Sequence, residues 1–333
     1  MIITKTPFRI SFFGGGTDFP DFYDKYGGTV ISTTIDKYCY VTIRYLPPFF
    51  EYTNELVYSK LERVTDVNEI NHPSIREAMK WFNMVNLRIV YEADLPARSG
   101  LGTSSSFAVG LLNGFYALQG KRVDKHQLAK DAIHLERVLC SERGGIQDQI
   151  AVSCGGLNRI SFDREDFYVD PIVMSIERKR LLKCSLMLFF TGFSRFSSDI
   201  QVAHQKNLED KKNQLLEIKS LVKDAETILT GSGDLNEFGK LLDYAWKLKR
   251  SISDRISTNC IDYIYSTAIK AGAIGGKLLG AGGGGFFVFF VEHDKQKAVR
   301  KALAKFMEVP FDFENGGTRV LYFTPEAYLK NNN

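Results

Sequence analysis

Glycines and hydroxyl side chains are concentrated in residues 95–106, a pattern typical of a loop that binds phosphate. Gly100 and Gly102 allow positive φ angles and a close approach of the backbone to a ligand, because they have no Cβ atom. The hydroxyl residues that follow can cap a helix, contact phosphate oxygens or bind a hard cation such as Mg²⁺; they are Thr103, Ser104, Ser105 and Ser106. An ordinary capped helix after a polar loop explains the same residues, so other parts of the chain must decide.

Two carboxylates further along the chain could divide between a metal ion and a substrate hydroxyl. Glu136 lies in a helical pattern over residues 127–139, and Asp148 lies in a glycine-containing turn before an apolar run. A metal ion takes such oxygen ligands, and a substrate hydroxyl needs a hydrogen-bond acceptor or a base. The alternative is that Glu136 is a solvated helix residue and that Asp148 forms a turn or caps a helix.

The first strand of the chain, predicted over residues 1–13, ends in three glycines that are followed by Thr17 and Asp18. Such a loop would let a polar ligand lie against bare backbone while Asp18 accepts hydrogen bonds from hydroxyl groups. A plain glycine turn with a solvated aspartate is the alternative. Within the strand, Arg9 alternates with apolar neighbours, so it lies on the opposite face and needs an anionic partner if it is buried.

A third glycine-rich stretch, residues 275–285, precedes an apolar run of strand-forming residues. Gly280, Gly282 and Gly285 match the G-x-G-x-x-G spacing of dinucleotide sites, but such a site needs a strand before the glycines and a helix after them. Lys277 lies in no Walker A pattern, and the sequence lacks the H-R-D and D-F-G signatures of protein kinases. Glycines are costly to order in a mere linker, so the stretch favours a close backbone approach to a ligand.

Two groups of helices and strands must position these residues, with a candidate boundary where the composition changes at residues 163–183. In the first half the pattern predicts a mixed or antiparallel sheet and three helices: strands 1–13, 29–45, 86–92 and 155–160, and helices 73–83, 107–118 and 127–139. Residues 46–70 are predicted to be mostly loop. The second half is predicted to be α+β, closed by its last strand: strands 185–190, 286–291 and 318–323, and helices at about 198–229, 235–249, 259–271 and 295–307.

Composition restricts the class of protein. The 333 residues suffice for about two domains. The formal charge of +4 is spread along the chain, which gives no reason to expect a nucleic-acid partner. Five cysteines without CxxC or zinc-like spacing favour free thiols in a reducing cytoplasm. The sequence shows no signal-peptide pattern and no apolar run of membrane length, so we expect a cytoplasmic protein without a membrane partner.

The three glycine-rich regions, in this order, resemble the motifs of the GHMP family of small-molecule kinases. Motif one matches at residues 7–18, motif two at 96–106 and motif three at 277–285, and the resemblance spans essentially the whole chain. Within the family, the Gly-Gly-Gly-Thr-Asp sequence of motif one is most similar to that of the D-glycero-D-manno-heptose 7-phosphate kinases. Many relatives have Gly-Glu-His-x-Asp instead, so a simple galactokinase is disfavoured.

The resemblance implies an α+β, two-domain GHMP kinase fold with the active site in the cleft between the domains. The N-terminal domain, residues 1–170, would resemble domain 2 of ribosomal protein S5 and carry motifs one and two with the catalytic aspartate. The C-terminal domain, residues 171–333, would be ferredoxin-like and carry motif three. The resemblance also implies ATP and Mg²⁺ as cofactors.

Roles for individual residues follow from the same resemblance. Asp148 matches the aspartate beside the acceptor hydroxyl, and Arg9 matches the cation that keeps it ionised. Ser104 and Glu136 match the ligands of Mg²⁺. Contacts with ATP are implied for Pro96, Gly100, Leu101, Gly102, Thr103, Ser104, Ser105, Gly282 and Gly283, and contacts with the acceptor for Gly15, Gly16, Thr17 and Asp18. Arg98, Arg159 or Arg195 could bind a phosphate on the acceptor, and Arg195 is taken as the substrate-binding candidate.

The implied reaction transfers the γ-phosphoryl group of ATP to the anomeric hydroxyl of D-glycero-D-manno-heptose 7-phosphate. Its product, heptose 1,7-bisphosphate, would serve the synthesis of nucleotide-activated heptose. One alternative is another GHMP sugar kinase, acting on fucose or a related hexose. A second alternative is a sugar or nucleotide sensor without catalytic activity, against which the presence of Ser104, Glu136 and Asp148 argues. The sequence leaves the oligomeric state open.

Overall fold

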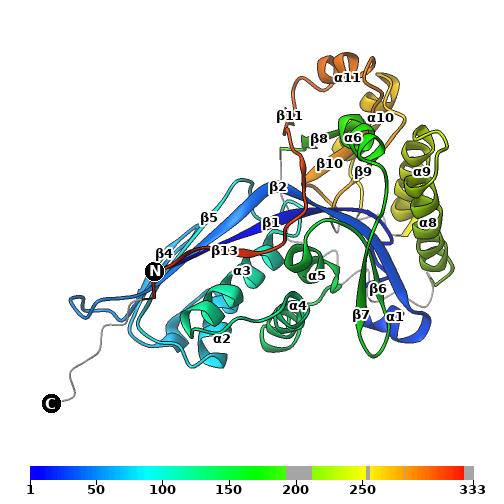
Figure 1. Cartoon of the computed structure of the whole chain (residues 1–333). Coiled ribbons are helices and arrows are strands. Elements are labelled where there is room, and N and C mark those ends of the chain that lie inside the picture. The colour runs from blue at the N-terminus through cyan, green and yellow to red at the C-terminus, as the bar shows by residue number, and fades with distance from the viewer. Residues whose placement is uncertain (193–211, 253–255, 281, 326–333) are drawn as a thin grey trace.

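The computed structural model of the protein describes residues 1–192, 212–252, 256–280 and 282–325. Two β-sheets organise these residues, and each sheet carries its own helices (Figure 1). The chain builds most of the first sheet, leaves it after residue 171 to build the second, and returns to the first sheet near residue 313.

The first sheet is formed around two long strands, β1 (Ile2–Phe13) and β2 (Gly28–Tyr45). Its strand order is β13-β1-β2-β5-β3-β4, and β2 also pairs with β6 and β12, while β7 pairs with β6. The other strands are β3 (Asn54–Val57), β4 (Leu61–Val64), β5 (Leu87–Ala93), β6 (Leu157–Phe162), β7 (Phe167–Pro171), β12 (Phe313–Glu314) and β13 (Arg319–Phe323). β3 pairs with β5 in parallel and β1 with β2 antiparallel, which confirms the predicted mixed sheet.

Within residues 46–70, predicted to be mostly loop, two short strands, β3 and β4, form a hairpin that the sequence pattern did not indicate. Leu56 is buried, but its neighbour Glu55 is buried as well and forms ion pairs with Arg63 at 3.0 Å and Arg88 at 2.9 Å. A buried, paired carboxylate interrupts the alternation of apolar and polar residues that identifies a strand. Arg63 lies opposite Glu55 on β4, whereas Arg88 lies on β5, outside the hairpin.

Helices cover one face of the first sheet, and the long helix α3 (Thr103–Leu118) lies directly on β1 and β2. Gly110 permits this close packing, because a Cβ atom there would lie 2.9 Å from the Thr6 hydroxyl. Phe107, Leu111 and Phe115 are buried, as the predicted helix required. The other helices of this part are α1 (Pro20–Tyr26), α2 (Pro73–Trp81), α4 (Lys125–Ile133), the π-helical turn η2 (His134–Leu139) and α5 (Gln147–Cys154).

A shift of register in β1 between Pro7 and Phe8 decides which side chains point at the helices. Before the shift, Thr4 donates a hydrogen bond to a carbonyl of α3 at 2.9 Å. After it, Arg9 and Ser11 bond to side chains of α5. Without the shift, Thr4 would point to the opposite face of the strand from Arg9 and Ser11, because side chains alternate between the two faces. The irregularity turns the strand, so that all three side chains point toward the helices.

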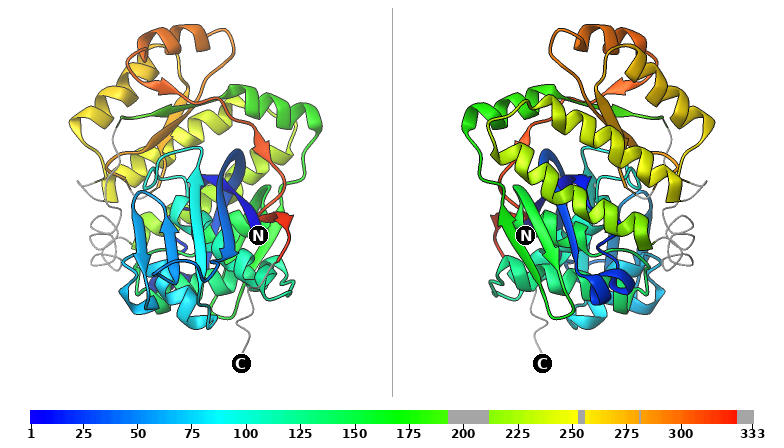
Figure 2. Two further views of the ribbon diagram at one scale, coloured as in Figure 1. Left: turned by 90° about the vertical axis from the view of Figure 1, so that its left-hand side faces the viewer. Right: turned by 90° about the vertical axis from the view of Figure 1, so that its right-hand side faces the viewer.

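The second sheet has the order β11-β8-β10-β9 and is antiparallel throughout. Its centre is β10 (Phe286–Phe290), all of whose residues are buried. The neighbouring elements are β8 (Leu186–Phe190), β9 (Gly275–Leu278), β11 (Met307–Glu308), α6 (Ile176–Ser185), α8 (Lys212–Thr230), α9 (Asn236–Ile252), α10 (Asn259–Lys270) and α11 (Gln296–Ala302). Figure 2 shows this sheet at one end of the molecule, whereas α8 extends from α9 along the first sheet, where it packs against β1 and β2. Residues 198–211 of the helix predicted over 198–229 lie outside the described residues.

Residues 275–285 do not form one continuous glycine loop. The first four of them, residues 275–278, form strand β9 of the second sheet. Gly276 has glycine for a packing reason: a Cβ atom there would lie 2.2 Å from the ring of Phe289. The loop proper is confined to the residues between β9 and β10.

The last strand does not close the second half, and that prediction was wrong. β13 pairs antiparallel with β1, with Ile2 opposite Phe323, and β12 pairs with β2. The composition of residues 318–323 identifies a strand, but strand partners far apart in sequence leave no local signal. The proposed division of the chain at residues 170 and 171 stays a prediction.

The two sheets meet at the end of β1. Phe238 of α9 packs edge-on against Phe12 and Phe13, with ring centroids 5.4 and 5.2 Å apart. The ammonium group of Lys277 in β9 donates to the carbonyls of Ser11 at 3.0 Å and Phe12 at 2.8 Å. Two elements of the second half, α9 and β9, thus hold the end of the strand that carries Arg9. None of the helices described is long and apolar enough to cross a membrane.

Candidate active site

The loop of motif two leads straight into α3, and its two glycines make the connection possible. Gly100 and Gly102 have φ angles of 83° and 73°, a conformation that other residues rarely adopt. Gly102 is the N-cap of α3, without a side-chain cap. The hydroxyl residues therefore form the first turn of the helix instead of capping it, and the amides of that turn have no partner within the helix. This is the arrangement in which a helix start binds anions.

The remaining residues of this loop differ in exposure. Pro96 is exposed, whereas Leu101 is buried and its carbonyl accepts a hydrogen bond from the amide of Arg9 at 3.0 Å. The hydroxyl of Thr103 accepts from the amide of Arg98 at 3.1 Å. Thr103 and Leu101 thus fix the loop to its surroundings. Contacts of these residues with ATP stay predictions.

Two serines of the first turn of α3 bond to the same carboxylate. Ser104 and Ser105 donate to opposite oxygens of Glu136 at 2.9 and 2.8 Å. Glu136 is buried and lies in η2, so it is not the solvated helix residue of the alternative interpretation. Ser104 is exposed and Ser105 is buried. The serine with an accessible hydroxyl is therefore the one predicted to bind Mg²⁺.

Gln149 belongs to this cluster and was missed in the sequence. Its side chain is fully buried in α5 and donates from Nε2 to Glu136, while its Oε1 atom has no partner in the structure. The described partners of the buried Glu136 carboxylate are thus all uncharged, which fits a site that a cation completes. The sequence around Gln149 does not predict its contact with Glu136, because the contact depends on how α5 packs against α3.

Ser104 and Glu136 fit a magnesium ion by the chemistry of their oxygen donors. Within the described ranges, no three side chains of His, Cys, Asp or Glu gather at a point that could hold a metal. Mg²⁺ commonly binds one or two protein ligands together with phosphate and water. A site with one carboxylate, from Glu136, and one hydroxyl, from Ser104, agrees with this coordination preference.

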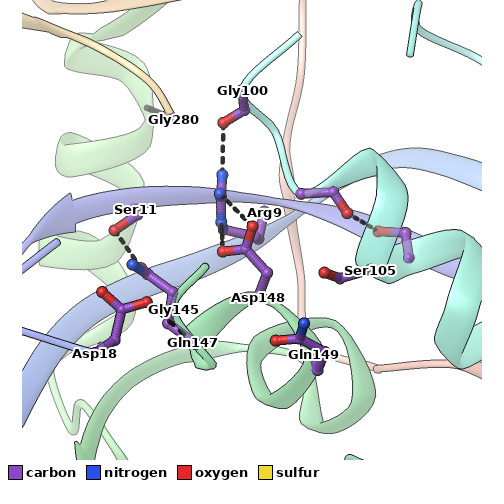
Figure 3. A network of polar contacts seen from close by, with 12 residues as sticks. Arg9, Ser11, Asp18, Gly100, Ser105, Gly145, Gln147, Asp148, Gln149 and Gly280 are labelled. Carbon is purple, nitrogen blue, oxygen red and sulfur yellow. Dashed lines mark hydrogen bonds and ion pairs between the residues drawn. The ribbon is translucent and has the colours of Figure 1, made fainter. Parts of the chain in front are cut away.

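Arg9 joins the aspartate to the phosphate-binding loop (Figure 3). Its Nε and Nη2 atoms donate to the two oxygens of Asp148 at 2.7 and 2.8 Å, and its Nη1 atom donates to the carbonyl of Gly100 at 2.7 Å. Arg9 is 4% exposed and Asp148 is 25% exposed. The predicted anionic partner of Arg9 is therefore Asp148. One rigid guanidinium fixes the position of a carboxylate that stays open to solvent.

Asp148 lies in the first turn of α5 and not in a turn before it, as the sequence had suggested. Ile146 is the N-cap and Gln147 the first residue of α5, so the helix begins three residues before the apolar run at Ile150. A carboxylate in the first turn is stabilised by the helix dipole. This placement also directs Gln147 toward β1, where its Oε1 atom accepts from the Ser11 hydroxyl at 2.7 Å.

Asp18 lies beside this pair, in the glycine turn after β1 (Figure 3). Its carboxylate accepts hydrogen bonds from the amides of Gly16 at 2.9 Å and Gln147 at 3.4 Å. Burial raises the pKa of Asp18, and the negative charge of Asp148 adds to the rise. Asp18 is buried, so it is not the solvated aspartate of a plain glycine turn.

The other residues of this turn have different surroundings. The hydroxyl of Thr17 is buried and donates to the carbonyls of Gly14 at 2.8 Å and Thr29 at 2.9 Å, contacts that hold the turn in place. A Cβ atom on Gly15 would lie 3.8 Å from the side-chain Nε2 atom of Gln147. Gly16 has a φ angle of 102°. Binding of the acceptor by Gly15, Gly16 and Thr17 stays a prediction.

The loop of motif three lies against that of motif two. A Cβ atom on Gly280 would lie 2.5 Å from the Cα atom of Gly100, and one on Gly285 would lie 2.2 Å from the carbonyl oxygen of Ser99. Only glycines allow two backbones to approach in this way. The third glycine-rich stretch is therefore explained by contact with another loop, in addition to any contact with a ligand.

Gly282 and Gly283, predicted to contact ATP, adopt φ angles of 117° and 77°. The amide of Gly283 donates to the carbonyl of Ile256 at 3.1 Å. Their contact with ATP stays a prediction. Arg195, the candidate for a phosphate on the acceptor, lies outside the described residues. Lys249 of α9, which donates to the carbonyl of Gly280, was also missed, because a lysine in a helix with many charges has no distinguishing pattern.

Comparisons with known proteins agree with this geometry. Residues 71–156 match the family model of the GHMP kinase N-terminal domain, and residues 218–309 match that of the GHMP kinase C-terminal domain. The D-glycero-alpha-D-manno-heptose 7-phosphate kinase of Campylobacter jejuni is 30% identical over 98% of this chain and 97% of that protein. A galactokinase of Pyrococcus furiosus is 26% identical over 92% of this chain and 94% of that protein.

A crystal structure of a D-glycero-D-manno-heptose 1-phosphate kinase from Bacteroides thetaiotaomicron superposes with a TM-score of 0.79, at 25% identity, covering 97% of this chain and all of that one. The predicted two-domain kinase fold is thereby confirmed. The protein is a phosphotransferase with an alcohol group as acceptor, for which ATP is the expected donor. The chain belongs to the GHMP kinase family.

Proposed function

We propose that this sugar kinase transfers the γ-phosphoryl group of ATP to the anomeric hydroxyl of D-glycero-D-manno-heptose 7-phosphate. The observation that carries the proposal is Asp148, held on both oxygens by Arg9 and partly open to solvent next to Gly100 of the phosphate-binding loop. The similarity to the Campylobacter jejuni enzyme over almost the whole of both chains supports this acceptor.

The arrangement suits phosphoryl transfer, which needs positioning and neutralisation of charge more than covalent chemistry. Asp148 would accept a hydrogen bond from the acceptor hydroxyl and orient it or take up its proton. Arg9 holds Asp148 at a fixed distance from the loop that binds the phosphates. The free amides of the first turn of α3 would bind phosphate oxygens.

Ser104 and Glu136 would hold Mg²⁺, which, when bound, neutralises charge on the phosphates. The protein keeps Glu136 ready for this role with hydrogen bonds from Ser105 and Gln149. On the other side, Asp18 would accept hydrogen bonds from hydroxyl groups of the sugar. The low exposure of Asp18 means that the sugar would replace little water there.

The decisive experiment measures ADP release by the purified protein with a set of possible acceptors. We expect release with D-glycero-D-manno-heptose 7-phosphate and the appearance of the new phosphate on C1 by ³¹P NMR. The Asp148→Asn variant serves as the blank for contaminating ATPase. Release with fucose or another free hexose, and not with the heptose 7-phosphate, would refute the proposed acceptor and favour the second candidate, a hexose kinase. That candidate has support from the L-fucokinase/L-fucose-1-P guanylyltransferase of Bacteroides fragilis, 26% identical over 89% of this chain and 35% of that protein.

Gly145→Ala tests the place of Asp18 in acceptor binding. A Cβ atom on Gly145 would lie 1.8 Å from the Oδ2 atom of Asp18, so the carboxylate must move. We expect the KM for the acceptor to rise ~10-fold, as for a lost hydrogen bond to a charged group, with a smaller change in the KM for ATP. Steady-state kinetics check this. Gly233→Ala is the matched control, because nothing lies within 4 Å of its added methyl group.

A further inference from the structure

We propose that Lys249 of helix α9 binds a phosphate oxygen of one of the two substrates, an inference that rests on the kinase function proposed above. Lys249 comes from the second half of the chain and donates a hydrogen bond to the carbonyl of Gly280 in the motif-three loop. The backbone of Gly280 touches that of Gly100, whose carbonyl accepts from Arg9. The ammonium group therefore lies close to the contact between the two glycine loops, next to the loop whose Gly100 carbonyl binds Arg9.

The other charged groups around Lys249 already have partners. Arg9 of β1 is paired with Asp148, and Lys277 of β9 donates to two carbonyls at the end of β1. Asp18 accepts from backbone amides. Burial and the positive charges of Lys249 and Arg9 lower the pKa of Lys277 well below its usual value, so Lys277 is a poor partner for an anion.

Lys249 is the cation of this group with capacity left for a ligand. Among the described carboxylates, none forms an ion pair with it, and Gly280 takes one of the three protons of its ammonium group. The side chain is partly buried. A phosphate oxygen is the ligand that suits a partly buried ammonium group with free protons, since lysine binds phosphate as a compact point charge.

The protonation of Lys249 responds to such a ligand. Burial and, to a smaller extent, the positive charge of Arg9 lower the pKa of Lys249 to about 8, with the negative charge of Asp18 opposing the change. Near pH 8 a substantial share of Lys249 is therefore neutral in the free protein. A bound anion favours the charged form, so binding takes up a proton at this pH.

Calorimetry of nucleotide binding tests the proposal without any acceptor. We expect the wild-type protein to take up a fraction of a proton, about one half, when it binds the non-hydrolysable analogue AMPPNP at pH 8. The heats in two buffers of different ionisation enthalpy give this number. In Lys249→Gln the uptake disappears, and the preference for AMPPNP over ADP falls ~10-fold, as for a lost charge-assisted hydrogen bond.

A second set of titrations identifies the source of the phosphate oxygen. If it belongs to the γ-phosphate of the nucleotide, Lys249→Gln affects AMPPNP and leaves the preference for heptose 7-phosphate over heptose unchanged. If the phosphate oxygen belongs to the acceptor, Lys249→Gln lowers the preference for heptose 7-phosphate over heptose and leaves the binding of AMPPNP unchanged. The proton is then taken up when the sugar phosphate binds. Either result supports a phosphate-binding Lys249. The nucleotide titrations stay informative even if the protein proves to phosphorylate another sugar.

Two further variants separate the charge from a structural role. Lys249→Arg keeps the charge and is expected to keep the preference for the phosphorylated ligand. Lys247→Gln is the matched control on the same helix, because Lys247 is exposed and paired with Asp243 at 2.7 Å. Wild-type proton uptake and wild-type preferences in both sets of titrations for a folded Lys249→Gln variant would overturn the proposal. So would equal losses in Lys249→Gln and Lys247→Gln.

Discussion

We expect Asp148→Asn to lower kcat at least ~100-fold, the lower limit for losing general-base help, while ATP still binds. Asparagine keeps the shape of the side chain but loses the charge that pairs with Arg9 at 2.7 and 2.8 Å. It also loses the ability to take up a proton from the acceptor hydroxyl. An assay of ADP release gives kcat, and calorimetry gives the Kd for ATP.

Asp170→Asn is the matched control for this variant. Asp170 is also paired with an arginine, Arg159, at 2.8 Å, but it is half exposed and lies on β7. We expect this control to keep the wild-type kcat. A near-normal kcat in Asp148→Asn would refute the role of Asp148, and a comparable loss in both variants would indicate a general effect of removing an ion pair.

Glu136→Gln is expected to lower kcat ~100-fold or more, the range for removing one electrostatic contact to the reacting group. The substitution removes the charge that would hold Mg²⁺. It also replaces one of the two Glu136 oxygens, which accept hydrogen bonds from Ser104, Ser105 and Gln149, with an NH₂ group. The serine hydroxyls can rotate to accept from that amide, so we expect the fold to survive. Titration of activity with Mg²⁺ should show a higher half-saturating concentration.

Ser104→Ala and Ser105→Ala distinguish metal binding from support of the carboxylate. Both hydroxyls donate to Glu136 at nearly equal distances, but only that of Ser104 is exposed. We expect Ser104→Ala to raise the Mg²⁺ requirement and Ser105→Ala mainly to lower the free energy of unfolding, by about 1 kcal/mol. Equal Mg²⁺ requirements in the two variants would contradict binding of the metal by Ser104.

Much of the candidate site could be predicted from sequence because its residues lie in patterns with a local meaning. Alternation along β1 placed Arg9 on the face opposite Phe8 and Ile10, and the structure provides Asp148 as the partner that this position required. The glycines of motif two adopt the positive φ angles for which glycine is suited. The apolar spacing after Ser106 predicted α3, although its start at Thr103 makes Gly102 the cap.

The features that escaped prediction depend on contacts between distant parts of the chain. Gln149 matters because α5 packs against α3, and Lys249 matters because α9 lies beside the glycine loops. The residues next to Gln149 and Lys249 in the sequence do not indicate either of these contacts. The same holds for β13, whose composition identifies a strand but not its partner.

The pairing of β13 with β1 has a consequence for biosynthesis. The outer edge of β1 stays without its neighbour until residues 319–323 have left the ribosome, after every strand of the second sheet has been made. Domains tend to fold in the order in which they are translated, and an open strand edge invites association with other chains. The nascent protein therefore exposes the edge of β1 at Ile2–Lys5 until residues 319–323 pair with it.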